Sequence, residues 1–65
     1  MSSENILRKK FVRAGTKASV YVWAPGFWRY GTLAEDYQRR DQRVRIRFAD
    51  GTSESVEKMF VRVES

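Results

Sequence analysis

The chain lacks cysteine and histidine altogether, and its 65 residues include a single proline. Without cysteine it can form neither a disulfide framework nor a thiolate zinc site. Without histidine it lacks the commonest metal ligand and the usual general base near neutral pH. The common nucleophile–base pairs cannot be built, and no glycine-rich phosphate loop precedes a helix. We therefore expect a non-enzymatic protein with no catalytic residues, no metal site and no cofactor.

Long hydrophobic runs and an acidic excess are also missing. No apolar stretch approaches the roughly 18 residues that a membrane-spanning helix needs, so we expect no membrane partner. Thirteen Lys and Arg against eight Asp and Glu give a net charge of +5. In so small a domain this balance indicates an anionic partner, most often nucleic acid and sometimes a membrane surface or an acidic peptide. The alternative is that the charge only keeps a small basic domain soluble. We expect a cytosolic or nuclear protein.

Strict alternation marks the most informative stretch. Val44, Ile46 and Phe48 alternate with three arginines, which predicts a half-buried strand over residues 43–49. Asp50-Gly51 follows and supplies the positive φ values of a tight hairpin turn.

Four further strands are expected where β-branched and aromatic residues gather between turn residues. Gly31, inside the second of them, marks a bulge or the close approach of another backbone. The expected strands are 17–23, 27–35, 43–49, 52–56 and 60–63, with a loop over 36–42 and a 3₁₀-like turn over 57–59. This pattern predicts an all-β fold, a small antiparallel barrel of five strands.

Before the barrel, which we expect over residues 15–65, lies a basic segment. We expect residues 1–14 to form a flexible N-terminal tail with a cluster at Arg8, Lys9 and Lys10. Two interpretations stay open. The cluster is either an arm that reaches a phosphate backbone or a solvated tail with Phe11 packed against the barrel.

Large aromatic residues form the first candidate site. The ends of the first and third strands and the start of the second can meet at one rim of a barrel. Aromatic faces and a carboxylate there would attract a methylated ammonium group, each cation–π contact contributing about 0.5–2 kcal/mol. The alternative is that these aromatics are core. The candidate cage residues are Trp23, Trp28, Tyr30, Phe48 and Asp50.

Arginines form the second candidate site. Side chains on one face of a strand repeat about every 7 Å, a spacing that can follow a phosphate backbone. Tyr37 is available to stack on an unpaired base. The alternative is a solvated face that Glu54 and Glu57 partly neutralise across the hairpin. The candidate nucleic-acid-binding residues are Arg39, Arg40, Arg43, Arg45 and Arg47, together with Arg8, Lys9 and Lys10.

The segment from Gly15 to Val63 resembles a Tudor domain, within the wider group of SH3-like barrels. It is similar to the Tudor domains of the lamin B receptor and of Polycomb-like proteins. The resemblance implies a five-stranded, strongly bent antiparallel barrel. The matching runs are Val20-Tyr21-Val22-Trp23, Pro25-Gly26-Phe27-Trp28, Gly31-Thr32-Leu33, Val44-Arg45-Ile46-Arg47-Phe48-Ala49-Asp50-Gly51, Val56 and Phe60-Val61.

Many Tudor domains read methylated lysine or arginine on histone tails and other proteins, through an aromatic cage. Trp23, Phe48 and Asp50 match cage positions of the family. Arg29 stands where the second strand often carries tyrosine, and Thr52 where an aromatic sometimes follows the Asp-Gly pair. The resemblance thus implies a nuclear, chromatin-associated reader with a partial cage. Members with incomplete cages tend to bind nucleic acid, unmodified partners or other domains.

These observations leave three hypotheses. The leading one is a monomeric binding module that recognises a methylated, histone-like protein tail through the partial cage. The alternative is DNA or RNA binding through the arginine-rich face of the third strand and the preceding loop. A purely structural interaction domain is the third.

Overall fold

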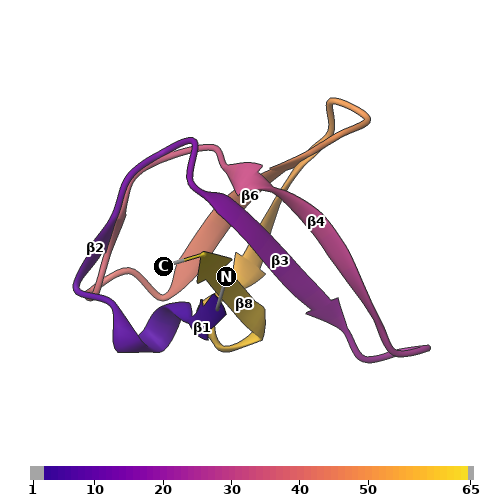
Figure 1. Ribbon diagram of the computed structural model, residues 1–65, viewed down its shortest axis with the longest axis horizontal. Coiled ribbons are helices and arrows are strands. Elements are labelled where there is room, and N and C mark those ends of the chain that lie inside the picture. The colour runs from indigo at the N-terminus through magenta and orange to yellow at the C-terminus, as the bar shows by residue number, and fades with distance from the viewer. Residues whose placement is uncertain (1–2, 65) are drawn as a thin grey trace.

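The computed structural model describes residues 3–64, and this part of the chain is all-β, without an α-helix. Short strands alternate with turns and with two 3₁₀ helices (Figure 1). The elements are β1 (Ser3–Asn5), η1 (Ile6–Arg8), β2 (Phe11–Val12), β3 (Lys17–Val22), β4 (Phe27–Leu33), β5 (Tyr37–Gln38), β6 (Arg43–Phe48), β7 (Ser53–Glu57), η2 (Lys58–Phe60) and β8 (Val61–Glu64).

Six strands form one antiparallel sheet in the order β1-β8-β3-β4-β6-β7, and β2 pairs with β5 in a second, two-stranded sheet. Strands β3, β4, β6 and β7 follow one another as neighbours, and β8 returns to lie beside β3 (Figure 1). The five strands expected from the sequence are β3, β4, β6, β7 and β8, with ends displaced by no more than two residues. The prediction of an antiparallel all-β fold is confirmed.

The N-terminal segment differs from the flexible tail that we expected. Ser3 pairs with Glu64 across β1 and β8, and Val12 pairs with Tyr37 across β2 and β5. Ile6 is fully buried. A chain this short has little apolar surface to bury, so Ile6 and Val12 of the N-terminal segment become part of the core. Residues 1–2 of the expected tail lie outside the described residues.

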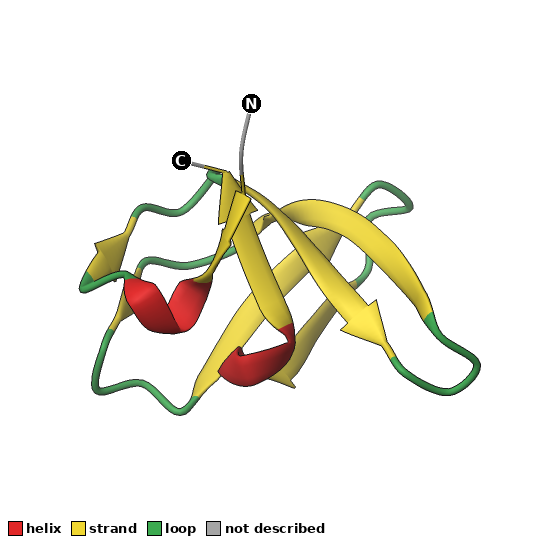
Figure 2. Cartoon of the chain, turned by 60° about the horizontal axis from the view of Figure 1, so that its bottom comes forward, coloured by secondary structure: helices red, strands yellow, loops and turns green. Residues whose placement is uncertain are grey.

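The two 3₁₀ helices lie close together near the start of β8 (Figure 2). The Asn5 side chain links them. Its Oδ1 accepts a hydrogen bond from the Leu7 amide (2.8 Å), and its Nδ2 donates to the carbonyl of Met59 (2.9 Å). The turn expected over 57–59 is thus a 3₁₀ helix shifted by one residue, and it is tied to the N-terminal segment.

The core follows the alternation of β6. Val44, Ile46 and Phe48 are buried, whereas the arginines between them are exposed, so the predicted inside and outside faces are confirmed. The buried apolar residues are Ile6, Val12, Ala18, Val20, Leu33, Tyr37, Val44, Ile46, Phe48, Val61 and Val63.

Two glycines shape the sheet around the site. A Cβ atom on Gly31 would collide with the carbonyl oxygen of Arg47, so the structure shows the second of the two expected alternatives, the close approach of another backbone. The β6–β7 hairpin also forms as predicted, but within its Asp50-Gly51 pair Gly51 alone has a positive φ, of 89°. The loop has three residues, 49–51, closed by a 2.8 Å hydrogen bond from the Phe48 amide to the Thr52 carbonyl. The Asp50 side chain, rather than a positive φ at Asp50, supports this turn.

Candidate functional site

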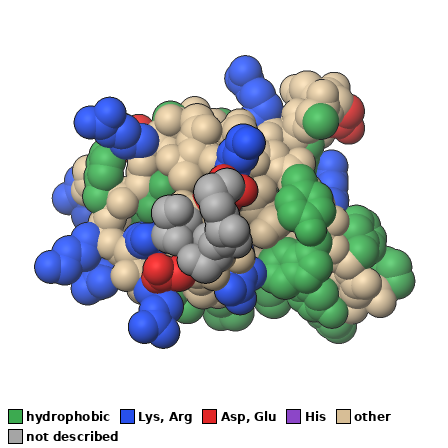
Figure 3. All heavy atoms as spheres, in the orientation of Figure 1, with side chains coloured by type: hydrophobic (Ala, Val, Ile, Leu, Met, Phe, Trp, Pro, Cys, Tyr) green, Lys and Arg blue, Asp and Glu red, His purple; other side chains and the backbone are tan. Residues whose placement is uncertain are grey.

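The β3–β4 hairpin carries an exposed group of aromatic side chains (Figure 3, lower right). Side chains of paired residues share a face, and successive residues alternate between faces. The pairs Tyr21–Trp28 and Ser19–Tyr30 therefore lie on one face of the hairpin, and Val20–Arg29 lies on the other. The exposed fractions are 37% for Tyr21, 70% for Trp23, 45% for Phe27, 39% for Trp28 and 72% for Tyr30.

Arg29 covers Phe48, one of the expected cage residues. Its guanidinium carbon lies 3.7 Å from the centroid of the Phe48 ring. Its Nη1 also donates a 2.8 Å hydrogen bond to Oε2 of Glu54, in an ion pair. Phe48 is only 6% exposed. One face of the Phe48 ring is therefore occupied by a cation of the chain itself.

The five expected cage residues do not meet around one cavity. Trp23 lines a groove of about 420 Å³ together with Arg29, Phe48 and Glu54. Trp28 and Tyr30 line a different groove, which Phe48 also borders. The physical reason is the alternation of β4, which sends Trp28 and Tyr30 to the face opposite Arg29.

Asp50, the expected acid of the cage, serves the hairpin turn. Its Oδ1 accepts hydrogen bonds from the Thr52 hydroxyl (2.6 Å) and the Thr52 amide (3.0 Å). The hydroxyl first and then the amide hold the pKa of Asp50 below its ordinary value, and the nearby charge of Arg29 adds to this effect. Asp50 is therefore an ionised turn residue at neutral pH.

The three arginines of β6 are exposed on one face, as expected. Arg43 is fixed by hydrogen bonds from Nε to Ser55 Oγ (3.1 Å) and from Nη2 to the Ser55 carbonyl (2.8 Å). The Nε of Arg45 lies 3.6 Å from a carboxylate oxygen of Glu35. Arg47 has no carboxylate within 4 Å among residues 3–64. We call Arg43, Arg45 and Arg47 the arginine row.

The expected neutralisation of the arginine row needs correction. The register places Glu57 opposite Arg43 but Glu54 opposite Ile46, on the other face of β7. There Glu54 pairs with Arg29. Glu35, which follows the end of β4, supplies the carboxylate near Arg45 instead. Glu35 thus replaces Glu54 as an acidic neighbour of the row, and the contact between Glu35 and Arg45 is the row's one ion pair within residues 3–64.

The other expected nucleic-acid-binding residues differ in whether an acidic side chain lies close to them. Arg39 and Arg40 are exposed in the loop that leads into the arginine row. In the N-terminal cluster, Arg8 Nε and Lys9 Nζ lie 3.8 and 3.7 Å from the Glu4 carboxylate, and Lys10 is exposed. The neighbouring aromatic Phe11 is 49% exposed, so it is only half packed.

Tyr37 cannot stack on a base as we expected, because it is only 2% exposed. It belongs to β5, which crosses a region predicted to be loop, and it packs into the core. Within residues 3–64 its buried hydroxyl has no hydrogen-bond partner. Lys58, whose Nζ lies 6.0 Å from the Tyr37 ring centroid, donates instead to the carbonyl of Arg39 (2.8 Å).

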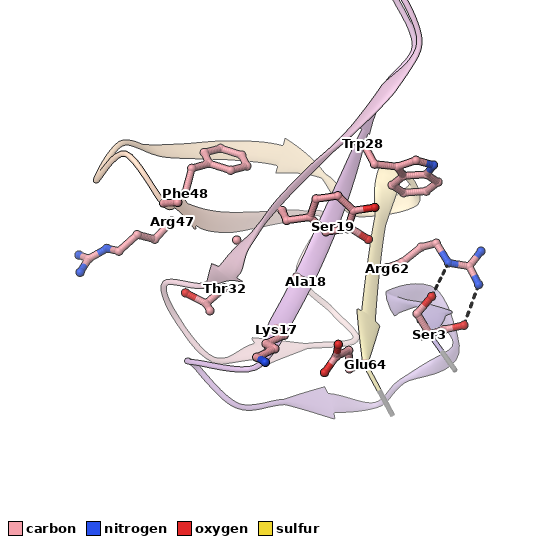
Figure 4. Close-up of a pocket in the computed structure, with 13 residues that line it drawn as sticks. Ser3, Lys17, Ala18, Ser19, Trp28, Thr32, Arg47, Phe48, Arg62 and Glu64 are labelled. Carbon is pink, nitrogen blue, oxygen red and sulfur yellow. Dashed lines mark hydrogen bonds between the residues drawn. The ribbon is translucent and has the colours of Figure 1, made fainter. Parts of the chain in front are cut away.

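Sequence reasoning missed the groove that Trp28 and Tyr30 line, which lies on the solvent face of the sheet (Figure 4). It has a volume of about 770 Å³, and Trp28, Tyr30, Lys17, Arg47 and Arg62 are among its lining residues. Alternation alone places Lys17 and Arg62 on an outer face. Their meeting with Arg47 depends on pairing between strands far apart in the chain, which no local pattern reveals.

Other kinds of site find little support in the described part of the chain. No group of three or more acidic side chains there could hold a metal ion. Nor is any helix among residues 3–64 long and apolar enough to cross a membrane.

Comparison of the chain with family models, curated proteins and solved structures finds no match. We therefore derive the function from the residues and their geometry.

Proposed function

We propose that this protein is a non-catalytic nucleic-acid-binding module and that the arginine row is its main contact surface. The observation that carries the proposal is the exposure of all three arginines on one face of β6, above the buried Val44 and Ile46. Buried neighbours hold the strand in place, so the three arginine side chains leave a rigid element at intervals of about 7 Å.

Charge supports the same proposal. The chain carries a net charge of +5, and Arg39 and Arg40 extend the arginine row into the adjoining loop. Guanidinium groups match phosphate oxygens in a bidentate geometry, and each phosphate that they neutralise releases condensed counterions. Binding should therefore be driven by phosphate contacts and should weaken as the salt concentration rises.

Methylated-tail recognition is the competing hypothesis. It requires a free aromatic cage, and Arg29 already covers the Phe48 ring. A methylammonium group would have to displace a guanidinium that is also bound to Glu54. Trp23, although 70% exposed, offers a single indole to such a group. This geometry favours the nucleic-acid proposal, and the peptide becomes the alternative outcome of the tests.

We also propose that the fold is an SH3-like barrel of the Tudor type. The strand order β8-β3-β4-β6-β7 and the 3₁₀ turn η2 before the last strand support this assignment. On this proposal β1, β2 and β5 are additions to the five-stranded unit. From the resemblance of residues 15–63 to Tudor domains we also propose a nuclear, chromatin- or RNA-associated role. We further propose that the isolated domain is monomeric.

The test is a fluorescence-anisotropy titration of labelled DNA and RNA oligonucleotides at two salt concentrations. Replacing the arginine row by glutamine (Arg43→Gln, Arg45→Gln and Arg47→Gln together) is expected to weaken binding at least tenfold. A protein with about three phosphate contacts should show a log–log salt slope of roughly −2 to −3. Binding that ignores salt would contradict the proposal.

A matched control removes the same three charges elsewhere. Arg8→Gln, Lys9→Gln and Lys10→Gln together also lower the net charge from +5 to +2. Two of these cations share the carboxylate of Glu4, so their loss is expected to weaken binding less than loss of the arginine row. Equal losses in the two triple variants would mean that net charge, and not the arginine row, controls binding.

A further inference from the structure

The groove on the solvent face of the sheet is formed by two rows of side chains that run across the strands. In one row Lys17 pairs with Thr32, and Thr32 pairs with Arg47, across β3, β4 and β6. In the other, Arg62 pairs with Ser19, and Ser19 with Tyr30, across β8, β3 and β4. Arg47 and Arg62 accordingly lie on opposite sides of the groove, with Ser19 and Thr32 between them (Figure 4).

Aromatic rings form one part of this groove. Tyr30 and Trp28 are two residues apart on β4, so they lie on the same face about 7 Å apart. Tyr30 is 72% exposed. The Trp28 ring is supported from the side by Tyr21, with ring centroids 5.1 Å apart and planes tilted by 57°. Both rings are therefore exposed in the groove and are not buried in the core.

Cations border the same groove. Arg62 is held in place by Ser3, to which Nε donates at the hydroxyl (3.1 Å) and Nη2 donates at the carbonyl (2.7 Å) (Figure 4). Within residues 3–64, neither Lys17 nor Arg62 lies within 4 Å of a carboxylate. Of the described residues that line the groove, Lys17, Arg47 and Arg62 are cationic and Glu64 is acidic. The groove is positive overall.

We infer that this groove binds unpaired bases of a single-stranded nucleic acid, with bases stacked on Tyr30 and Trp28 and phosphates held by Arg47, Arg62 and Lys17. This inference rests on the proposed function and narrows its substrate class. Exposed rings flanked by cations are the combination that single strands require, because every base has a stacking face and every linkage a charge. In a duplex the base faces are already stacked and cannot reach Tyr30.

Arg47 connects the two surfaces. It is the last member of the arginine row, and it also borders the groove. A single strand can therefore run from the arginine row past Arg47 onto the rings. A duplex can use only the arginine row. The preference for single strands should consequently depend on the rings, whereas binding to both forms should depend on the arginine row.

The experiment compares a single-stranded oligonucleotide with a duplex of the same length, by anisotropy and by tryptophan fluorescence. The chain has two tryptophans, so Trp23→Phe leaves Trp28 as the only indole. Stacking on Trp28 should quench its emission with the single strand and leave it nearly unchanged with the duplex. Emission that responds equally to both forms, or to neither, would overturn the inference.

A matched pair of substitutions completes the test. Tyr30→Ala and Trp23→Ala each remove a ring that is about seven-tenths exposed, but only Tyr30 lines this groove. Tyr30→Ala is expected to weaken single-strand binding about tenfold, in line with the loss of one stacked base. Trp23→Ala should leave the affinity for the single strand within twofold of the wild type. Tyr30→Phe keeps the ring and should retain the wild-type affinity.

The outcomes separate the two proposals. Single-strand and duplex binding of equal strength, or equal effects of Tyr30→Ala and Trp23→Ala, would overturn the single-strand inference and leave nucleic-acid binding standing. Absence of binding to either form at low salt would overturn both. Amide NMR spectra of each variant establish that the fold is retained before the affinities are compared.

Discussion

The guanidinium of Arg29 lies 3.7 Å from the centroid of the Phe48 ring and is held there by Glu54. Arg29 is on β4, Phe48 ends β6, and Glu54 is on β7, so this contact ties three neighbouring strands together. It also places a cation of the chain where a cation-binding cage would place its ligand. The contact is therefore both a structural link and the main obstacle to methylammonium recognition.

The first prediction concerns the stability that this contact provides. Arg29→Ala removes both the ring contact and the ion pair, and we expect a loss of about 1 kcal/mol in the free energy of unfolding. Glu54→Gln removes only the ion pair and should cost less, because Glu54 is half exposed. Urea denaturation measures both. Equal costs would mean that stacking on Phe48 contributes nothing.

The second prediction concerns Gly31. A Cβ atom at this position would meet the backbone carbonyl of Arg47, and neither strand can yield without breaking the β4–β6 pairing. We expect Gly31→Ala to cost more than about 3 kcal/mol. Gly51→Ala is the control, because a Cβ atom at Gly51 would have open space around it. Only the positive φ of this residue opposes the substitution, and we expect it to cost about 1–2 kcal/mol of stability. If thermal unfolding showed a smaller loss of stability for Gly31→Ala than for Gly51→Ala, this would contradict the close approach of the Arg47 carbonyl to Gly31.

The third prediction tests whether the N-terminal segment belongs to the fold. Ile6 is fully buried, whereas its neighbour Leu7 is 46% exposed. Ile6→Ala should lower the free energy of unfolding by about 2–5 kcal/mol, the usual cost of deleting buried methyl groups. Leu7→Ala should change it by roughly 0.5 kcal/mol or less. If both variants unfold at the wild-type urea midpoint, the segment is a tail after all.

The fourth prediction concerns the buried hydroxyl of Tyr37. Burying a polar group without a hydrogen bond costs free energy, and this hydroxyl has no partner within residues 3–64. Tyr37→Phe should therefore leave stability unchanged or raise it by up to about 1 kcal/mol. Tyr37→Ala should lower it by about 3–5 kcal/mol, because the ring fills the core. A clear loss of stability in Tyr37→Phe would show that the hydroxyl is bonded.

The fifth prediction is a pH dependence. The Thr52 hydroxyl and amide lower the pKa of Asp50 in the folded state. The ionised carboxylate therefore stabilises the fold above the unfolded-state pKa of about 3.9, and this contribution is lost as the pH falls through the folded-state pKa. Carboxyl-carbon NMR should give a lower midpoint for Asp50 in the wild type than in Thr52→Val. Identical midpoints would rule out the hydroxyl as the cause.

Local patterns predicted the strands well. The alternation of Val44, Ile46 and Phe48 with arginines depends only on the geometry of one strand, so both faces of β6 were predicted correctly. Gly31 was likewise informative, because a glycine inside an aromatic strand often marks a place where another backbone comes close.

Pairing between distant strands limited the prediction of the site. The cage hypothesis required Trp23 and Asp50 to share one cavity with Tyr30, but Trp23 lines a different groove and Asp50 lines neither of the two. The pairing of Gly31 with Phe48 across β4 and β6 places Arg29 on the Phe48 face, where it covers the ring. The groove bounded by Arg62 and Arg47 likewise joins β8 to β6 across two intervening strands. Tyr37 was misplaced because its polar neighbours resemble a loop, although its own ring is buried.

The most direct measurement is an amide and indole NMR titration of the isotope-labelled protein with a single-stranded oligonucleotide and, separately, with a trimethyl-lysine peptide. We predict that the oligonucleotide shifts the amides of Arg43, Arg45 and Arg47 and the indole of Trp28, and that the peptide leaves the Trp23 indole unmoved. Shifts at Trp23 and Phe48 with the peptide, and none along β6 with the oligonucleotide, would contradict nucleic-acid binding through the arginine row.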